Sequence, residues 1–292
     1  MRSASKNSCN PESFHVTARS GWPISGVDFT SRPSKQKQIT IATATMRRRA
    51  FELQSIKEYS DWETYECWLS RDGPWVAGFD FPFGLPREAT RDLGWPATWG
   101  DLVLHCRSLG RESFRAALDR YRESRAAGSR YAHRATDLPA GSHSPLKLVN
   151  PPVGLMFLEG APRLLEAGVT IPGLVKGDPL RIAFEAYPGF TARQMVKASY
   201  KNDARSKQTP QRTRARKAIV AALVSRANPF DIALSASART LNSLVRDASG
   251  DRLDAVLCAL QAAWAWRRRA DNYGLPSKID SLEGWIAMVA EK

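Results

Sequence analysis

Three acidic residues occur within short apolar segments that are typical of buried strands. They are Asp28 in Ile24–Phe29, Asp80 in Val76–Phe81 and Glu185 in Ile182–Ala186, and each is the single acid of its segment. Acidic residues are depleted in strands, and a buried carboxylate without a partner is costly or takes up a proton. A salt bridge to an arginine or a cap at a strand end would explain any one of them. Three together favour a shared cation, because neighbouring carboxylates repel one another.

A predicted helix near the end of the chain carries two further acids. Asp251 and Asp254 lie on one side of this helix because they are three residues apart. An acid in a first helical turn, such as Asp251, is also explained by the positive end of the helix dipole. Asp254 lies deeper in the helix, at the edge of its apolar stripe. The predicted site therefore consists of Asp28, Asp80 and Asp254, with Asp251 and Glu185 as separable members.

Carboxylates that converge from several elements suit a hard divalent cation. Mg²⁺ and Mn²⁺ prefer oxygen ligands, and two such ions about 3.5–4 Å apart can activate a water and stabilise the leaving oxygen of a phosphodiester. A zinc site would need histidine or cysteine ligands, but the four histidines and four cysteines show no such spacing. The expected cofactor is therefore Mg²⁺ or Mn²⁺.

Strands must hold these carboxylates at their ends. The pattern predicts five strands: Ile24–Phe29, Ile39–Thr45, a segment around Phe51 and Leu53, Trp75–Phe81 and Arg181–Tyr187. Short links join the first three, so we expect an antiparallel meander. Ser60-Asp-Trp-Glu63 is a capping box that starts a helix before the fourth strand. The helices predicted after the fifth strand are Pro210–Ser225, one or two within Asn228–Asp247, and Asp251 to about Arg269.

The middle and the ends of the chain show other patterns. Residues 87–178 contain one clear basic helix, Ser113–Ala127, among long segments rich in Gly, Pro, Ser and His, so we predict a loop-rich insertion beside the site. Residues 1–20 are polar and are expected to be a disordered tail. Residues 21–292 are expected to form a single domain that carries the insertion at about 87–178. The last apolar segment, 284–289, is expected to be an edge strand or a packed helix.

The motifs resemble those of a known superfamily and family. Gly26-Val-Asp28, Asp80 and Asp251-x-x-Asp254 resemble the carboxylate set of the ribonuclease H-like superfamily. Four longer motifs resemble, more closely, the family called domain of unknown function 429, whose members are described as predicted nucleases. These motifs are Gly78–Pro86, Phe184–Pro188, Asp251–Ala255 and Glu283–Ile286. The resemblance spans about Gly26 to Ile286.

The resemblance implies an α/β fold of the ribonuclease H-like type. Its mixed five-stranded sheet has the first three strands antiparallel and helices on both faces. Mg²⁺ or Mn²⁺ would be held by Asp28, Asp80, Asp254 and Asp251, and Glu185 would belong to the family's Glu-x-Tyr/His-Pro motif. The implied activity is a metal-dependent nuclease that hydrolyses nucleic-acid phosphodiesters by a two-metal mechanism, although fold analogy alone does not establish chemistry.

The charge of the chain favours a nucleic-acid partner, DNA or RNA. Lysine and arginine number 43 against 29 acidic residues, a formal net charge of +14, which attracts polyanions. A basic run follows the fifth strand and provides candidate nucleic-acid contacts: Lys201, Arg205, Lys207, Arg212, Arg214, Arg216 and Lys217. A solvated surface is the simpler explanation of any charge run. His143, in a Gly/Ser/Pro segment, is either a candidate for proton transfer or an exposed loop histidine.

Two other functions stay open from the sequence. The first is a module of the same fold that binds nucleic acid without catalysis. The second is a phosphotransferase of the actin-like or carbohydrate-kinase type, which the superfamily also contains. The chain has no Gly-x-x-x-x-Gly-Lys-Ser/Thr motif, although Thr30 and Ser31, shortly after Asp28, could contact a phosphate.

The sequence favours a soluble, cytoplasmic protein. The four cysteines lie far apart and are expected to be reduced thiols. Residues 1–20 lack the apolar core of a secretory signal. The longest apolar run, Ala255–Trp266, is too short to span a bilayer, so no membrane partner is expected.

Overall fold

The computed structural model describes residues 21–291, apart from the side chain of Arg205. Within these residues the chain forms seven strands and nine α-helices. The predicted disordered tail, residues 1–20, lies outside the described residues. The strands are β1 (Trp22–Asp28), β2 (Ile39–Arg47), β3 (Ala50–Tyr59), β4 (Trp75–Phe79), β5 (Val169–Thr170), β6 (Asp178–Glu185) and β7 (Ala233–Ser235). The α-helices are α1 (Trp62–Leu69), α2 (Arg87–Asp92), α3 (Trp99–Glu123), α4 (Asp137–Ala140), α5 (Val153–Ala167), α6 (Pro188–Met195), α7 (Pro210–Val224), α8 (Ala238–Arg246) and α9 (Asp251–Arg267).

The strands form one mixed sheet in the order β5-β6-β4-β1-β2-β3-β7. β1, β2 and β3 form the predicted antiparallel meander, and β4 and β6 run parallel to β1 on its other side. The prediction of five strands was wrong because β5 and β7 extend the two edges. These strands have two and three residues, which is too short for an alternating pattern to be visible in the sequence.

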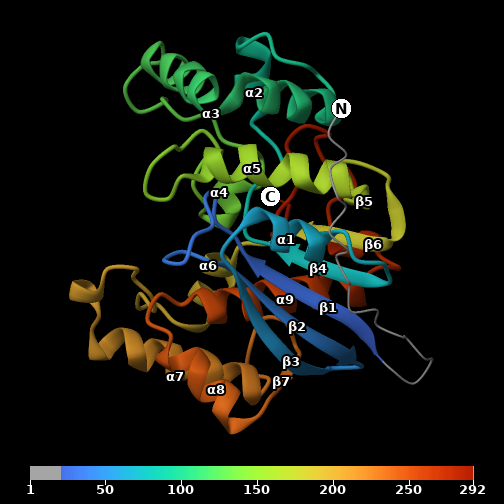
Figure 1. Cartoon of the computed structure of the whole chain (residues 1–292), viewed down its shortest axis with the longest axis vertical. Coiled ribbons are helices and arrows are strands. Elements are labelled where there is room, and N and C mark those ends of the chain that lie inside the picture. The colour runs from blue at the N-terminus through green and yellow to red at the C-terminus, as the bar shows by residue number, and fades with distance from the viewer. Residues whose placement is uncertain (1–20, 292) are drawn as a thin grey trace, which may run out of the picture.

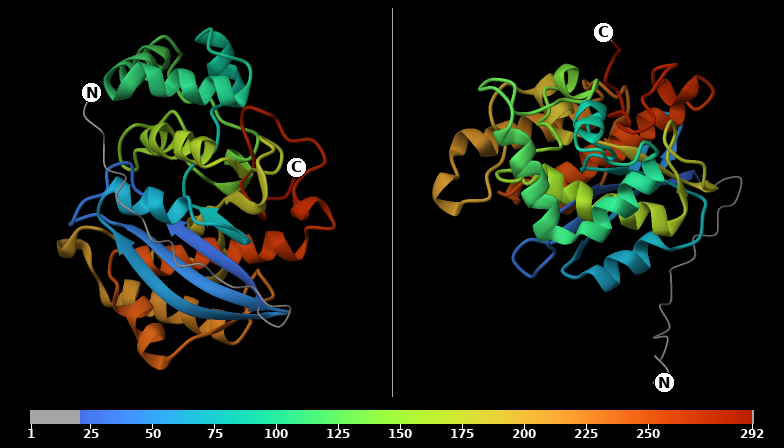
Figure 2. Two further views of the ribbon diagram at one scale, coloured as in Figure 1. Left: turned by 45° about the vertical axis from the view of Figure 1, so that its right-hand side comes forward. Right: turned by 90° about the horizontal axis from the view of Figure 1, so that it is seen from above.

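Helices cover both faces of the sheet, as the sequence resemblance implied. α9 crosses one face together with α7 and α8, and α1, α3 and α5 cover the other (Figure 1, Figure 2). Successive strand residues point into opposite layers. In β4, Trp75 and Ala77 contribute to the core beneath α1, α3 and α5, whereas Val76 contributes to the core beneath α9.

α9 lies directly on the sheet because glycines of two neighbouring strands face it. A Cβ atom on Gly26 would lie 2.1 Å from the carbonyl oxygen of Ala255, and one on Gly78 would lie 2.3 Å from that of Cys258. Any larger residue would therefore push the helix away from β1 and β4. The close approach allows acids in the first turn of α9 to reach the ends of both strands.

The segment 87–178 is more helical than predicted. α3 begins well before the expected Ser113, and Gly110 interrupts it with a φ of 68°. α5 occupies a segment that looked like a loop, because Pro152 and Gly154 at its start concealed the apolar pattern that follows. α5 packs closely on the site region, since a Cβ on Gly160 would lie 2.5 Å from the ring of Phe81. The description of this segment as loop-rich was therefore wrong for α5.

Two smaller expectations also need correction. The side chain of Asp61, and not that of Ser60, caps α1 by accepting a hydrogen bond from the backbone of Thr64. The segment 284–289 is neither strand nor helix, but Ile286 forms an isolated parallel bridge with Glu185. The cap is a local side-chain bond and the bridge joins segments far apart in the chain, and an apolar pattern reveals neither.

The cysteine expectation holds in part. Cys106 and Cys258 are free and buried. Cys67 is disulfide-bonded, so the expectation of reduced thiols was wrong for this residue. Sequence spacing does not show which cysteines come close in space. Separately, none of the helices in the described part of the chain is long and apolar enough to cross a membrane.

Gly26→Ala is expected to destabilise the protein by about 3 kcal/mol, because the added methyl group overlaps the backbone of α9. Gly100→Ala is the matched control, since a Cβ atom added at this position meets no other part of the described chain within 4 Å. Chemical denaturation measures both free energies of unfolding. Equal stability of the two variants would contradict the role assigned to the close helix–sheet contact.

Candidate metal centre

Three carboxylates come together at one edge of the sheet. Asp28 is the last residue of β1, Asp80 directly follows β4, and Asp254 lies in the first turn of α9. β1 and β4 are parallel neighbours with Val27 opposite Phe79, so the acids that follow these two residues lie side by side. One oxygen from each of the three carboxylates lies within 4.8 Å of those of the other two. This cluster is the core of the site predicted from the sequence.

Asp28 is buried and has an unsatisfied oxygen. It is 5% exposed, and within residues 21–291 no donor forms a hydrogen bond to its Oδ2. Burial raises the pKa of Asp28 well above its usual value, and the carboxylates of Asp251 and Asp254 add to this rise against the opposing charge of Lys201. A buried acceptor without a partner is unfavourable. A cation between the acids would remove this deficit.

The other two acids of the cluster also resist ionisation. Burial raises the pKa of Asp80 to about 7, and the charge of Lys201 opposes this rise. Burial likewise raises the pKa of Asp254, again against Lys201. Each of the three groups therefore binds a proton more readily than an ordinary aspartate does. Cation binding is expected to release these protons, because only the ionised forms are good ligands.

Asp254 is held by its neighbours on the chain segment that follows α6. The ammonium of Lys201 forms an ion pair with Asp254 Oδ2, and the hydroxyl of Tyr200 donates to Oδ1 at 2.6 Å. Arg216 fixes this segment by donating to the carbonyl oxygen of Tyr200 at 2.6 Å. Burial alone would lower the pKa of Lys201, but Asp254 raises it well above its usual value. Lys201 is therefore a charged counter-ion to the cluster.

Asp251 belongs to the rim of the site and not to the cluster. It forms an ion pair with Lys37, whose Nζ lies 2.8 Å from Asp251 Oδ1. Lys37 lies in the link between β1 and β2, and the charges of Asp28 and Asp251 raise its pKa above the usual value despite burial. Nothing in the sequence selects this lysine, because its neighbours in the chain are ordinary polar loop residues.

Glu185 lies near the cluster but serves a different bond network. Arg134 donates to its two carboxylate oxygens at 2.8 and 2.7 Å, and the backbone of Phe83 donates at 2.9 Å. Arg134 also pairs with Asp137 and donates to the carbonyl oxygen of Glu283. The structure therefore does not bring Glu185 together with the three metal-ligand candidates. The buried ion pair between Glu185 and Arg134 fixes the segments that surround the site. Arg134 was missed at the level of the sequence because nothing near it in the sequence indicates burial.

A pocket of about 780 Å³ opens onto the carboxylates. Asp28 and Asp80 lie in it, and Thr30 and Ser31 form part of its wall, as does His143. Its lining also includes the basic side chains of Arg193, Lys197 and Lys201. A solvent-accessible, partly basic pocket over a buried acidic cluster can admit an anion to a bound cation.

The seven basic candidates for nucleic-acid contacts do not share one role. Lys201 lies at the cluster, and Arg216 is buried, with its guanidinium bonded to backbone oxygens, so Arg216 was wrongly assigned to the surface. Lys207, Arg214 and Lys217 are exposed and Arg212 is partly exposed, whereas the side chain of Arg205 lies outside the described residues. His143 lines the pocket, and burial lowers its pKa, as does the neighbouring Lys147, whose Nζ lies 3.3 Å from His143 Nε2.

The donor set fits a hard divalent cation. The cluster consists of carboxylates without sulfur or imidazole ligands, and oxygen ligands are those that Mg²⁺ and Mn²⁺ prefer. The unsatisfied Oδ2 of Asp28 supplies a free ligand atom. Lys201 would have to give up its contact with Asp254, and its side chain, 39% exposed, has a flexible stem that permits this.

One comparison with known proteins finds a match. The sequence profile of a family described as "Protein of unknown function (DUF429)" matches residues 26–278, which include all three carboxylates of the cluster. No curated protein and no solved structure matches the chain.

The metal-free protein is expected to lose stability as the pH rises from about 4 to about 7. The folded state keeps a proton on Asp80, whose pKa is raised from 3.8 to about 7, whereas the unfolded state releases it. With a chelator present to remove metal ions, Asp80→Asn should therefore raise the free energy of unfolding at about pH 8 by about 1–2 kcal/mol. This value is reduced to allow for the partial exposure of Asp80. Denaturation of both proteins at several pH values measures this, with Asp72→Asn as an exposed control. A less stable Asp80→Asn variant at that pH would contradict the expectation.

Proposed function

The chain belongs to the DUF429 family, and we propose that it is a metal-dependent nuclease that hydrolyses nucleic-acid phosphodiesters. The observation that carries this proposal is the convergence of Asp28, Asp80 and Asp254, with one oxygen of Asp28 left unsatisfied. The expected cofactor is Mg²⁺ or Mn²⁺. When bound, it would supply a Lewis acid that activates water and stabilises negative charge on a phosphate.

The arrangement of the long strands supports a ribonuclease H-like fold. β3-β2-β1-β4-β6 form the continuous centre of the sheet, with the first three strands antiparallel and helices on both faces. This is the five-stranded pattern that the sequence resemblance implies, with β5 and β7 as additions at the edges. Asp28 and Asp80 lie at the ends of two neighbouring parallel strands, where ligands reach open α/β sheets.

The chain's own residues have defined roles in this proposal. Tyr200 orients Asp254 through the 2.6 Å hydrogen bond, and Arg216 holds Tyr200 in place. Lys201, once displaced from Asp254, keeps a positive charge in the pocket, where it can stabilise the charge that develops on a phosphate. Lys37 keeps Asp251 from adding a further unpaired negative charge beside the cluster.

A phosphotransferase is the second candidate function. Thr30 and Ser31 line the same pocket as the carboxylates, so their polar groups could contact a transferred phosphate. This candidate requires a nucleotide, and it would be favoured if a nucleotide with Mg²⁺ stabilised the protein beyond the effect of Mg²⁺ alone. The nuclease has no such requirement.

Mn²⁺ is expected to stabilise the wild-type protein by about 2–3 kcal/mol at about hundredfold excess over its Kd, because it binds the folded state alone. Asp28→Asn should remove most of this stabilisation, since it replaces the buried ligand with a neutral amide. Thermal denaturation with and without Mn²⁺ measures the effect, and Asp72→Asn, an exposed site, should respond like the wild type. Equal stabilisation of Asp28→Asn would place the cation elsewhere.

Cleavage of labelled DNA or RNA in Mn²⁺ tests the activity itself. Asp28→Asn is expected to lower the rate by about a thousandfold, because the metal contributes several kcal/mol and each factor of ten corresponds to about 1.4 kcal/mol. Asp72→Asn should cleave at the wild-type rate. No cleavage by the wild type, or equal cleavage by Asp28→Asn, would reject the nuclease. Binding without cleavage would indicate a nucleic-acid-binding module instead.

A further inference from the structure

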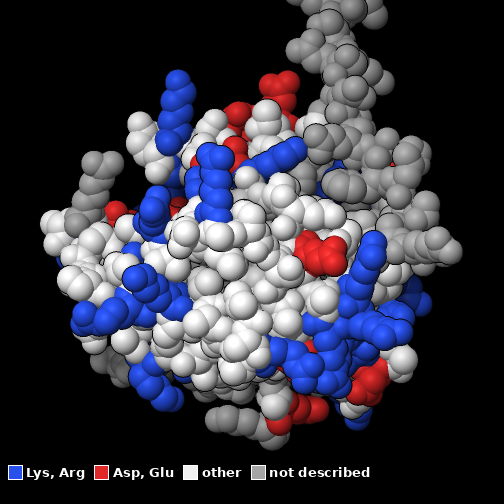
Figure 3. Space-filling model, turned by 90° about the horizontal axis from the view of Figure 1, so that it is seen from below, with Lys and Arg blue, Asp and Glu red and all other residues white. Residues whose placement is uncertain are grey.

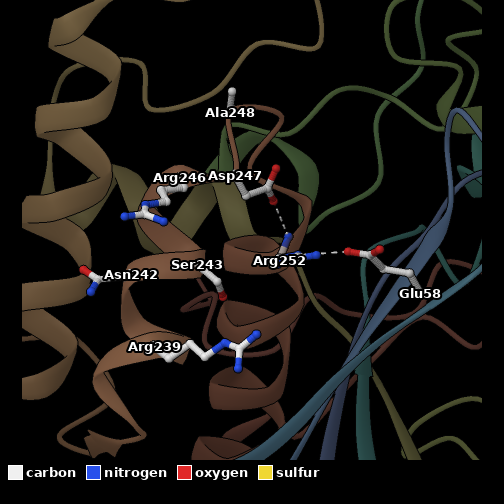
Figure 4. A pocket seen from close by; sticks show the side chains of 8 residues that line it. All are labelled: Glu58, Arg239, Asn242, Ser243, Arg246, Asp247, Ala248 and Arg252. Atoms are coloured by element: carbon white, nitrogen blue, oxygen red, sulfur yellow. Dashed lines mark hydrogen bonds and ion pairs between the residues drawn. The ribbon is translucent and has the colours of Figure 1, made fainter.

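A second pocket, of about 630 Å³, lies along α8 outside the metal centre. Figure 4 shows the side chains that line it. We call it the α8 pocket, and its residues are Glu58, Arg239, Asn242, Ser243, Arg246, Asp247, Ala248 and Arg252. Polar and charged side chains dominate this lining, so it is suited to a charged ligand.

The two acids of the α8 pocket already have partners. Glu58 accepts a hydrogen bond from Arg252 Nε at 2.9 Å. Asp247 accepts from the backbone nitrogen of Arg252 at 2.8 Å and from the hydroxyl of Ser249 at 2.7 Å. These bonds tie the acids to α9 and to the loop before it, so one of the pocket's three arginines is neutralised.

The other two arginines are exposed, and neither has a partner within residues 21–291. Arg239 and Arg246 form no hydrogen bond or ion pair with any other described residue through their guanidinium groups. They lie seven residues apart on α8, which places them on one face of the helix about 10.5 Å apart along its axis. Asn242 and Ser243 lie between them and offer polar hydrogen-bonding groups.

This spacing favours an extended polyanion over a small anion. The two guanidinium groups point in different directions in Figure 4 and do not converge on one point. A single phosphate could therefore contact one of them but not both. A nucleic-acid backbone presents phosphates in series, and arginine and amide side chains are its usual contacts.

The α8 pocket is separated from the metal centre by one loop. The carbonyl oxygen of Ala248, which lines the α8 pocket, accepts hydrogen bonds from the backbone of Asn202 at 3.4 Å and from Gln208 Nε2 at 3.0 Å. Asn202 itself lines the pocket over the carboxylates. Gly250, at the end of the same loop, leads into α9 and packs against Lys201. A strand that leaves the metal centre past Asn202 would meet the α8 pocket next.

The surrounding surface has matching charge. α7 packs beside α8 at the lower end of the molecule in Figure 1 and carries the exposed Arg214 and Lys217. Seen from below, Lys and Arg side chains gather in several groups around a largely uncharged centre, with fewer acidic side chains among them (Figure 3). This face can therefore attract a polyanion over a longer path than one pocket.

We propose that the α8 pocket binds the phosphate backbone of the nucleic acid whose phosphodiester lies at the metal centre. The proposal rests on the proposed nuclease function for the identity of the polymer. Arg239 and Arg246 contact successive regions of the backbone, and these contacts hold the substrate in position without reading its sequence. The metal centre and the α8 pocket together define a substrate longer than the few nucleotides around the cleaved bond.

The test is a binding titration that does not depend on cleavage. Fluorescence anisotropy of a labelled duplex and a labelled single strand, each of about 30 nucleotides in length per strand, is measured in a chelator over a range of salt concentrations. The double variant Arg239→Ala/Arg246→Ala is expected to bind about tenfold more weakly, with the slope of log K against log salt reduced by about 1.8 for the duplex. Arg239→Lys/Arg246→Lys should keep most of the slope, because it keeps both charges.

Arg115→Ala/Arg120→Ala is the matched control. It removes the same charge from α3, at the opposite end of the molecule from α8 (Figure 1), and should change the slope little. If both double variants weakened binding equally, the loss would come from the change in net charge alone, and the proposal would be overturned. Unchanged binding by Arg239→Ala/Arg246→Ala would also overturn it, as would displacement of the nucleic acid from this pocket by inorganic phosphate at low concentration.

The outcome is separate from that of the nuclease proposal. Binding that depends on Arg239 and Arg246, together with no cleavage in Mn²⁺, supports the α8 pocket and rejects the nuclease. Cleavage that depends on Asp28, together with unchanged binding by Arg239→Ala/Arg246→Ala, supports the nuclease and rejects the α8 pocket.

Discussion

The close contact between α9 and the sheet is the constraint on which the rest of the structure depends. Gly26 and Gly78 leave no side chain between β1, β4 and the backbone of α9. Because these glycines lie two residues before Asp28 and Asp80, the same contact that seals the core brings Asp254 to the ends of both strands. Stability and the site therefore depend on one interface, and neither can be altered there without the other.

Electrostatics then decides the character of the site. Three acids, two of them buried and Asp80 partly buried, lie within a few ångströms of one another in surroundings that raise their pKa values. Lys201 and Lys37 offset part of this cost, one through Asp254 and the other through Asp251. A buried acidic cluster with positive charge supplied by movable side chains is a site in which a cation can replace an ammonium group.

Residues of one type take different roles because their surroundings differ. Glu185 occurs in the same kind of apolar strand as Asp28 and Asp80, yet Arg134 satisfies both of its carboxylate oxygens. Within the basic run after β6, Lys201 faces the carboxylates, whereas Arg216 is buried and supports Tyr200. The partner that a charged side chain contacts therefore decides whether it supports the fold or is available for chemistry.

The sequence by itself determined the five long strands, the antiparallel meander, the late helix and the choice of Asp28, Asp80 and Asp254. These features follow from local patterns, since an acid in an apolar strand and the period of a helix are visible in a few neighbouring residues. Tertiary structure alone decided the edge strands, the helix α5 and the pairing of Glu185 with Arg134 and of Asp251 with Lys37. These depend on contacts between residues far apart in the chain, where burial and charge partners are set by the packing of the whole fold and not by local sequence.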